Sequence, residues 1–315
     1  MDRGIFCRDK KALFDTVRGM QGSIVALVTP FDDHGQVDTT ALRSLIERHI
    51  VSGTDAIVVC ATTGEAPTLS AQEQREVIEE SVRIAARRIP IIAGTGTYAT
   101  GSSVEKTRDA QKAGADACLV VFPYYNRPTP IGIQRHIEEI ARVGMPLIPY
   151  HHPGRTGVRL SAQFLAALMA LPEVVAIKDC SGDMDAIIQL ISMTDKPVLT
   201  GDDVYSPALI AVGGKGVISV LANVIPKEWK EMIDLCLRGN FSAARDIFYR
   251  FYPLYRAMAL ETNPQCVKYA VGLLGLCRDH LRLPLLVPQD VVQEEIRQEM
   301  GRLGLLTQSI TAGIG

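Results

Sequence analysis

No stretch of this 315-residue sequence approaches the roughly 18 to 20 consecutive apolar residues that a membrane-spanning helix requires. The amino terminus also lacks an uninterrupted apolar segment followed by a cleavage site, so we expect a chain that is neither inserted into a membrane nor exported. Neither charge sign is in excess, because 33 basic and 35 acidic residues leave a net charge of −2. Nucleic acid and anionic membranes are therefore poor candidates as partners, and we expect a small molecule instead.

Paired cysteines are missing too. The seven cysteines are odd in number, widely spaced and without a C-x-x-C pair, and three of them lie in apolar segments with the pattern of strands. This usage is typical of a reducing compartment, where cysteine serves as a small apolar side chain. We therefore predict a cytoplasmic location.

The sequence has little that indicates a metal or a phosphate group. No G-x-G-x-x-G opens a helix, and there is no H-E-x-x-H. Adjacent residues of a strand point to opposite faces, so His151 and His152 would not readily chelate one ion. The glycines around Lys215 precede a strand instead of following one, which is the wrong end of a barrel for phosphate. We expect no metal.

Short apolar segments alternate with amphipathic segments from Gly22 to about residue 240, and 47% hydrophobic residues suffice for a large core. Eight segments have the apolar, β-branched composition of buried strands: 23–29, 55–61, 90–94, 117–122, 146–151, 174–179, 197–200 and 216–221. Eight helices are expected after them, several opened by Ser, Thr or Asp and closed by Gly: 39–52, 70–88, 102–113, 130–143, 161–171, 184–193, 204–212 and 226–238.

Eight β/α units over about 220 residues predict an α/β fold, a closed (β/α)8 TIM barrel. A doubly wound open sheet is the alternative, but it would not need eight units in unbroken succession. After Asn240 the strands stop, and residues 241–260, 264–276 and 289–306 predict an all-helical appendage. We thus divide the chain into an N-terminal extension (1–19), a barrel (20–240) and a C-terminal helical domain (241–315). Met20 is an alternative start.

Reacting groups of such a barrel come from the carboxyl ends of its strands. Lys178 closes the apolar run Val-Val-Ala-Ile-Lys-Asp, and desolvation there would favour the neutral, nucleophilic amine. A carbonyl substrate would trap that amine as a Schiff base. The alternative is an ammonium group that reaches solvent at the strand end.

Other strand ends carry polar residues that would converge on the same mouth. Tyr150 has a phenol able to pass a proton, or else a buried ring with a wet tip. Thr62 and Thr63, followed by a glycine, could receive a carboxylate or form an ordinary Ser/Thr turn. Arg155 suits bidentate capture of a carboxylate, although arginines are common in surface loops.

Together these segments resemble the dihydrodipicolinate synthase and N-acetylneuraminate lyase family, most closely its dihydrodipicolinate synthase branch, from Gly22 to about Pro288. The resemblance rests on an ordered series of motifs: Gly22 to Pro30, Thr62-Thr63-Gly64-Glu65, Pro123 to Pro128, Tyr150 with Pro153-Gly154-Arg155-Thr156-Gly157, Ile177-Lys178-Asp179, Gly201-Asp202-Asp203, Gly216 to Val220, and Asn263-Pro264 with Val267-Lys268.

The resemblance implies a (β/α)8 barrel with a C-terminal helical domain, usually a homotetramer built as a dimer of dimers. It implies that Lys178 condenses with pyruvate, whose carboxylate lies against Thr62 and Thr63, with the backbone of Ile218 completing the pocket. The imine is itself an electron sink that makes the pyruvate methyl carbon acidic. No organic cofactor is therefore expected.

The resemblance also assigns the remaining roles. Tyr150 would be the proton donor and acceptor, in a relay with a threonine and with Tyr125 from the adjacent subunit. The enamine would attack L-aspartate 4-semialdehyde, whose carboxylate Arg155 would hold, to give 4-hydroxy-tetrahydrodipicolinate for diaminopimelate and lysine biosynthesis. Two positions depart from the pattern: Ala61 replaces a usual glycine and His151 a usual asparagine, which bears on the second-substrate pocket.

Three alternatives remain at this point. A lyase of the same family acting on N-acetylneuraminate or 2-keto-3-deoxygluconate is one, although Arg155 suits a carboxylated second substrate better than a polyol. A non-catalytic binding homologue is another, since fold alone does not fix function. A phosphate-binding metabolic barrel would need glycine loops after the seventh and eighth strands, which the sequence lacks.

Regulation by L-lysine is expected to be weak or absent. The resemblance places the feedback site of regulated family members at five positions: Ala66, Ala71, Gln74, Tyr98 and Ser102. The polar residues expected there are mostly missing.

Overall fold

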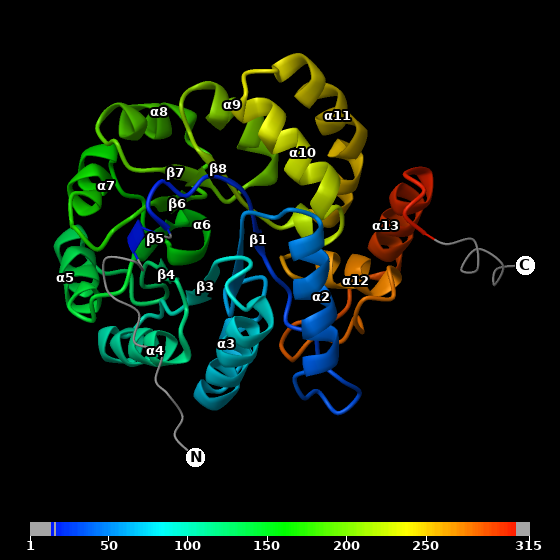
Figure 1. Cartoon of the computed structure of the whole chain (residues 1–315), viewed down its shortest axis with the longest axis horizontal. Helices are drawn as coiled ribbons and strands as arrows, with labels where there is room; N and C mark the ends of the chain where they lie inside the picture. Colours follow the sequence, from blue (N-terminus) through cyan, green and yellow to red (C-terminus); the bar gives the residue numbers. More distant parts are fainter. Residues whose placement is uncertain (1–13, 16, 307–315) are drawn as a thin grey trace, which may run out of the picture.

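The computed structural model describes residues 14–15 and 17–306, and within them eight parallel strands close into a barrel surrounded by helices (Figure 1). Each strand pairs with the next in the sequence, and β8 pairs with β1 from Gly22↔Gly216 to Val25↔Ser219. The predicted (β/α)8 barrel is therefore confirmed. The open-sheet alternative is wrong, because this last pairing leaves no free edge.

The strands are β1 (Gly22–Ala26), β2 (Ala56–Val59), β3 (Ile91–Gly94), β4 (Ala117–Val121), β5 (Leu147–His151), β6 (Ile177–Asp179), β7 (Val198–Thr200) and β8 (Gly216–Ser219). The helices around them are α2 (Thr39–Val51), α3 (Ala71–Ala85), α4 (Thr100–Ala113), α5 (Pro130–Ala141), α6 (Pro153–Thr156), α7 (Ala162–Met169), α8 (Met184–Ser192), α9 (Ser206–Ala211) and α10 (Pro226–Leu237). The last helices are α11 (Phe241–Met258), α12 (Gln265–Leu273) and α13 (Asp290–Arg302).

Alternation along each strand decides which side chains enter the barrel. Ile24, Ile148 and Leu199 share one buried cluster inside the barrel, whereas Val25 and Leu147 belong to the larger cluster between barrel and helices. Successive side chains of a strand point to opposite faces. This period of two places every second residue at a strand end in the mouth of the barrel.

All eight predicted strands are present, and each is shorter than expected. The second strand ends at Val59, because Cys60 takes a left-handed backbone with φ of 54°. The sixth was expected from residue 174, yet Val174 makes only an isolated bridge and the strand proper starts at Ile177. The Pro-Gly turn after the fifth strand is a single helical turn, α6, which the sequence analysis missed.

The helices begin where the sequence offers caps. Ser70 and Glu73 form a reciprocal capping box at the start of α3, and Asp38 caps α2 by accepting a hydrogen bond from the Ala41 amide. After the barrel, α11, α12 and α13 gather on one side, beside α10 and α2 (Figure 1). The described residues contain no helix that is both long and apolar enough to cross a membrane.

Most of the predicted N-terminal extension (1–19) lies outside the described residues. In the part that is described, Phe14 and Val17 are buried and share the interior cluster with Met20, Ile24 and Ala117. Since Met20 lies two residues before the start of β1, these side chains lie at the amino end of the barrel, opposite the mouth to which the strand ends lead.

Candidate active site

Lys178 and Tyr150 lie side by side at the carboxyl ends of β6 and β5, where the two residues are paired in the sheet register. The Lys178 Nζ atom is 4.2 Å from the centroid of the Tyr150 ring, and the two residues are only 5% and 4% exposed. Both side chains point inward. The alternative of a lysine ammonium free in solvent is thus excluded by its burial.

Burial dominates the electrostatics of this pair. Desolvation lowers the pKa of Lys178, and the neighbouring Cys180 and Asp202 oppose that shift. Burial raises the pKa of the Tyr150 phenol well above its ordinary value, with Cys180 adding to the shift. Desolvation also raises the pKa of Asp202 to about 6, against the nearby charge of Lys178. The shifts of Lys178 and Tyr150 both act toward the neutral form of each group, and the neutral form of the amine is the one that adds to a carbonyl carbon.

Cys180 and Gly201 complete the surroundings of the lysine. The Cys180 thiol donates to the Tyr150 phenol oxygen over 3.7 Å. Gly201 leaves the space that both side chains occupy, since a Cβ atom there would lie 2.1 Å from Lys178 Cε and 2.2 Å from Cys180 Sγ. Sequence reasoning missed Cys180, although its spacing of two from Lys178 already predicts that it faces the same side.

His151 and Asp179 form a second pair on the outer face of the same two strands. His151 Nδ1 lies 2.7 Å from Asp179 Oδ2, and both side chains are buried. The Leu160 amide donates to Nε2 of the ring, so Nδ1 carries the proton that the aspartate accepts. The pair is adjacent in register to Tyr150 and Lys178 and fixes β5 against β6. This gives His151 a structural role that the sequence analysis left open.

A chain of hydrogen bonds joins the expected carboxylate-binding residues to the C-terminal helices. Asn263, just before α12, donates from Nδ2 to Thr63 Oγ1 over 3.0 Å. Arg155 Nη2 donates to the Asn263 carbonyl over 3.1 Å. Asn263 therefore holds both the loop after β2 and helix α6. From the sequence, Asn263 is noted only as part of a motif that carries the family resemblance.

Beneath the threonines lies a buried ion pair. Lys268 Nζ is 2.5 Å from Glu65 Oε1, both side chains are fully buried, and the other carboxylate oxygen accepts the Arg282 amide. Lys268 Nζ also lies 4.0 Å from the centre of the Phe31 ring. Glu65 has a left-handed backbone with φ of 54°, so the pair anchors the turn that carries Thr62 and Thr63.

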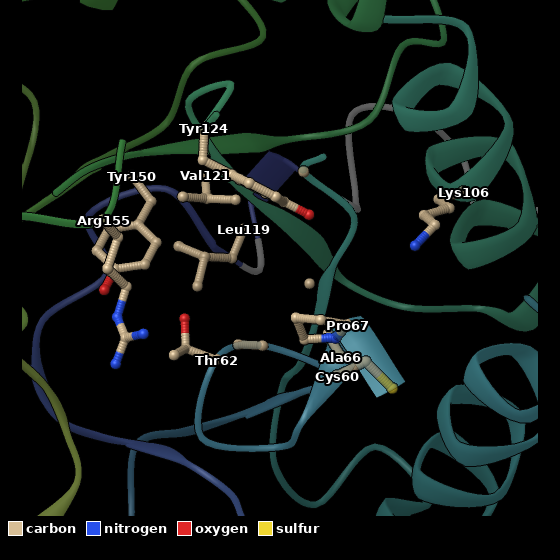
Figure 2. A pocket seen from close by; sticks show the side chains of 13 residues that line it. Cys60, Thr62, Ala66, Pro67, Lys106, Leu119, Val121, Tyr124, Tyr150 and Arg155 are labelled. Carbon is tan, nitrogen blue, oxygen red and sulfur yellow. The ribbon is translucent and has the colours of Figure 1, made fainter. Parts of the chain in front are cut away.

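A cavity of about 220 Å³ lies beside Tyr150 and Thr62, and Figure 2 shows side chains that line it. Tyr150, Thr62 and Arg155 line one end, with the Thr62 hydroxyl directed toward the phenol and the guanidinium beside it (Figure 2). Ile218 is buried in the interior cluster together with Tyr150. The structure thus brings Lys178, Tyr150, Thr62 and Arg155 to one mouth, as the sequence analysis expected.

Tyr125 is the exception. Its side chain is 91% exposed, and its backbone is left-handed with φ of 71°. It is not among the described residues that line the cavity containing Tyr150; Lys178 and Thr63 are not among them either, but both of those side chains are buried. From the resemblance we expect Tyr125 to act in an adjacent subunit, and its position on the surface is compatible with that expectation.

Of the five positions of the expected lysine-feedback site, one has its polar group engaged elsewhere. Gln74 is buried, and its side-chain amide donates to the Ala66 carbonyl over 2.8 Å. Tyr98 packs edge-on against Tyr124, with ring centroids 5.5 Å apart.

A desolvated lysine beside a buried phenol at the carboxyl end of a parallel barrel defines a class of site built for Schiff-base chemistry. The model of the dihydrodipicolinate synthetase family matches residues 19–303. The chain is 45% identical to a 4-hydroxy-tetrahydrodipicolinate synthase from Thermodesulfovibrio yellowstonii over 289 residues, which cover 91% of this chain and 99% of the relative. This chain belongs to the dihydrodipicolinate synthetase family.

Solved structures agree with this assignment. A dihydrodipicolinate synthase from Aquifex aeolicus superposes with a TM-score of 0.90 at 43% identity, covering 92% of this chain and all of that one. The Acinetobacter baumannii enzyme in complex with pyruvate has a TM-score of 0.89 at 41% identity, covering 91% of this chain and 99% of its own. The phosphate-binding metabolic barrel is thereby set aside.

Proposed function

We propose that this chain condenses pyruvate with L-aspartate 4-semialdehyde to give 4-hydroxy-tetrahydrodipicolinate, a reaction of diaminopimelate and lysine biosynthesis. The observation that carries the proposal is the buried amine of Lys178, held 4.2 Å from the Tyr150 ring. The names of the relatives, which share 42 to 45% of their residues with this chain, support the same activity.

The first half-reaction needs an amine and a carboxylate anchor. The neutral Lys178 amine adds to the keto carbon of pyruvate, and loss of water leaves the imine. Thr62 and Thr63 hold the pyruvate carboxylate, with the backbone of Ile218 closing the pocket. The Thr63 hydroxyl accepts from Asn263, so its own proton is free to point at that carboxylate.

The second half-reaction needs a proton shuttle. Tyr150 mediates the loss of a methyl proton, and the resulting enamine attacks the aldehyde carbon of the second substrate. Arg155 holds the carboxylate of that substrate, because a guanidinium matches it in charge and planar geometry. The amino group of the semialdehyde then displaces the lysine by transimination, which closes the ring and frees Lys178 without a metal or organic cofactor.

Tyr125 takes part in this reaction only if subunits associate. We propose a homotetramer, a dimer of dimers, in which Tyr125 reaches the relay of Tyr150 and Thr62 in an adjacent subunit. The exposed ring on a left-handed backbone supports this, since such strain persists where the surroundings require it. We also propose that the protein acts in the cytoplasm. We place the boundary between the barrel and the helical domain near residue 240.

The test begins with trapping. We expect incubation with pyruvate and borohydride to place a stable adduct on Lys178, located by peptide mass spectrometry. Lys178→Arg should lose the adduct while keeping its circular dichroism spectrum and its thermal midpoint. An adduct on another amine, or none at all, contradicts the proposal.

Turnover then separates this proposal from its two alternatives. Aspartate semialdehyde should be consumed with pyruvate much faster than N-acetylneuraminate or 2-keto-3-deoxygluconate is cleaved. Preference for a sugar acid would make the chain a lyase of the other branch. Adduct formation without turnover of any of these would favour a binding homologue.

A further inference from the structure

His152 takes no part in the reaction steps given above, although it lies next to the groups that perform them. It follows the end of β5, two residues after Tyr150, and a period of two turns both side chains to the same face. The two rings are in edge contact, with centroids 5.7 Å apart and an interplanar angle of 61°. His151, between them, faces outward to Asp179. His152 therefore lies at the mouth of the barrel, beside the proton shuttle.

The short helix α6 also brings His152 close to Arg155. His152 is the N-cap residue of α6, and its carbonyl accepts hydrogen bonds from the amides of Arg155 and Thr156 over 3.0 Å each. Tyr150 and Arg155 line the same end of the cavity (Figure 2). His152 is thus next to both the phenol that moves protons and the guanidinium to which we assign the carboxylate of the second substrate.

One nitrogen of the His152 ring is available to a ligand. Nδ1 is buried, without a hydrogen-bond partner among the described residues, and a Cβ atom on Gly154 would lie 3.5 Å from it. Nε2 also lacks a partner in the described part of the chain, but it is not buried. Burial lowers the pKa of His152 to about 4, and the charges of Arg155 and Lys178 add to the shift. The ring is therefore neutral at neutral pH, and one of its nitrogens is a hydrogen-bond acceptor.

The second substrate has a donor that suits this acceptor. L-Aspartate 4-semialdehyde has its ammonium group on the same carbon atom as its carboxylate, so a carboxylate held by Arg155 brings the ammonium group beside His152. A neutral imidazole nitrogen can accept from an ammonium group, whereas an imidazolium would repel it. Lys178 does not oppose this arrangement, because its nitrogen is uncharged once the imine has lost a methyl proton and become the enamine.

We propose that His152 determines specificity for an aldehyde that has an ammonium group next to its carboxylate: Nε2 of the imidazole accepts a hydrogen bond from that ammonium group. The contact with Tyr150 keeps the ring at the mouth of the barrel. This inference rests on the proposed function and adds recognition of the amino group of the second substrate. Succinate semialdehyde has the same aldehyde and carboxylate but no amino group, so it cannot make this contact.

Three variants of His152 separate recognition from support of Tyr150. His152→Phe keeps a ring against Tyr150 and removes both nitrogens. His152→Gln places its amide near the position of Nε2, and His152→Asn, the matched control, places its amide near that of Nδ1. For each protein we would measure kcat/KM for aspartate semialdehyde, Ki of succinate semialdehyde as its competitor, and the rate at which the borohydride-trapped pyruvate adduct forms.

His152→Phe should lower kcat/KM for aspartate semialdehyde at least about tenfold, because a hydrogen bond to a charged group is lost. Ki of succinate semialdehyde and the rate of adduct formation should stay at their parental values. His152→Gln should retain most of the parental kcat/KM, and His152→Asn should not.

An unchanged kcat/KM in His152→Phe overturns the inference. An equal loss in Ki of succinate semialdehyde or in adduct formation also overturns it, because His152 would then only support Tyr150. If His152→Phe fails to fold, the comparison of His152→Gln with His152→Asn decides by the same criteria. A parent protein that does not turn over aspartate semialdehyde removes the proposed function together with this inference, whereas parental turnover that is insensitive to His152 removes the inference alone.

Discussion

Replacing Gly201 by alanine adds one methyl group at the point where the structure has least room for it. The new Cβ would lie 2.1 Å from Lys178 Cε, 2.2 Å from Cys180 Sγ and 3.1 Å from Lys178 Nζ, against an ordinary contact of 3.4–4 Å. The backbone of Gly201 is not left-handed, so alanine is compatible with its dihedral angles. The effect of the substitution is therefore purely one of space.

The lysine must move by more than an ångström to admit this methyl group, and it cannot move toward Tyr150, whose ring is already in contact with its amine. Misplacement of a reacting group by about 1 Å costs on the order of 100-fold in rate. Overpacking of a dense interior costs about 1–3 kcal/mol of unfolding free energy. We expect Gly201→Ala to show both losses.

The rate at which the borohydride-trapped pyruvate adduct forms measures the loss in reactivity, and urea unfolding measures the loss in stability. Gly101→Ala is the matched control, since its Cβ would meet nothing within 4 Å and its backbone is not left-handed. In helix α4 it should leave adduct formation unchanged and raise stability by up to about 1 kcal/mol. If Gly201→Ala formed the adduct at the parental rate, the placement of Lys178 described above would be wrong.

Four further outcomes follow from the same contacts. Cys180→Ala should lower kcat about fivefold, which corresponds to the loss of one neutral hydrogen bond, and should leave KM for pyruvate unchanged. Cys180→Ser should restore the rate. A rise in KM with kcat unchanged would contradict the thiol contact with Tyr150. Lys268→Met should reduce the free energy of unfolding in urea by about 3–5 kcal/mol, because Glu65 is left as an unpaired buried charge. Adding Glu65→Leu should restore most of the lost stability. A double variant as unstable as Lys268→Met would contradict this explanation. Burial lowers the pKa of His49 to about 3, so on acidification the unfolded state takes up a proton before the folded state does. The free energy of unfolding should therefore fall as pH drops below 6.5, by up to about 1.4 kcal/mol per pH unit. His49→Gln should flatten this slope, and an unaltered slope would refute the role of His49. L-lysine should inhibit turnover weakly or not at all, and half-maximal inhibition at sub-millimolar concentration in a steady-state assay would falsify that expectation.

The regular parts of the fold could be read from local pattern, and the departures have local causes. The apolar run that ends at Lys178 predicts a buried strand, and its alternation predicts that Lys178 and Cys180 face one way and Asp179 the other. The left-handed residue Cys60 ended its strand early, against the strong β propensity of the preceding valines. Helix α6 was missed because four residues beginning with Pro-Gly carry no helical periodicity.

The sequence by itself determined the architecture of this protein and indicated its candidate site residues. Strand and helix periods repeat eight times, and the family motifs occur in order along one chain. Only the tertiary structure decided which groups touch: that Cys180 reaches the Tyr150 phenol, that Asn263 joins Thr63 to Arg155, and that Lys268 neutralises Glu65. These contacts link residues far apart in the chain, and barrel closure together with side-chain packing sets their distances. Local sequence specifies neither the closure of the barrel nor the packing of its side chains.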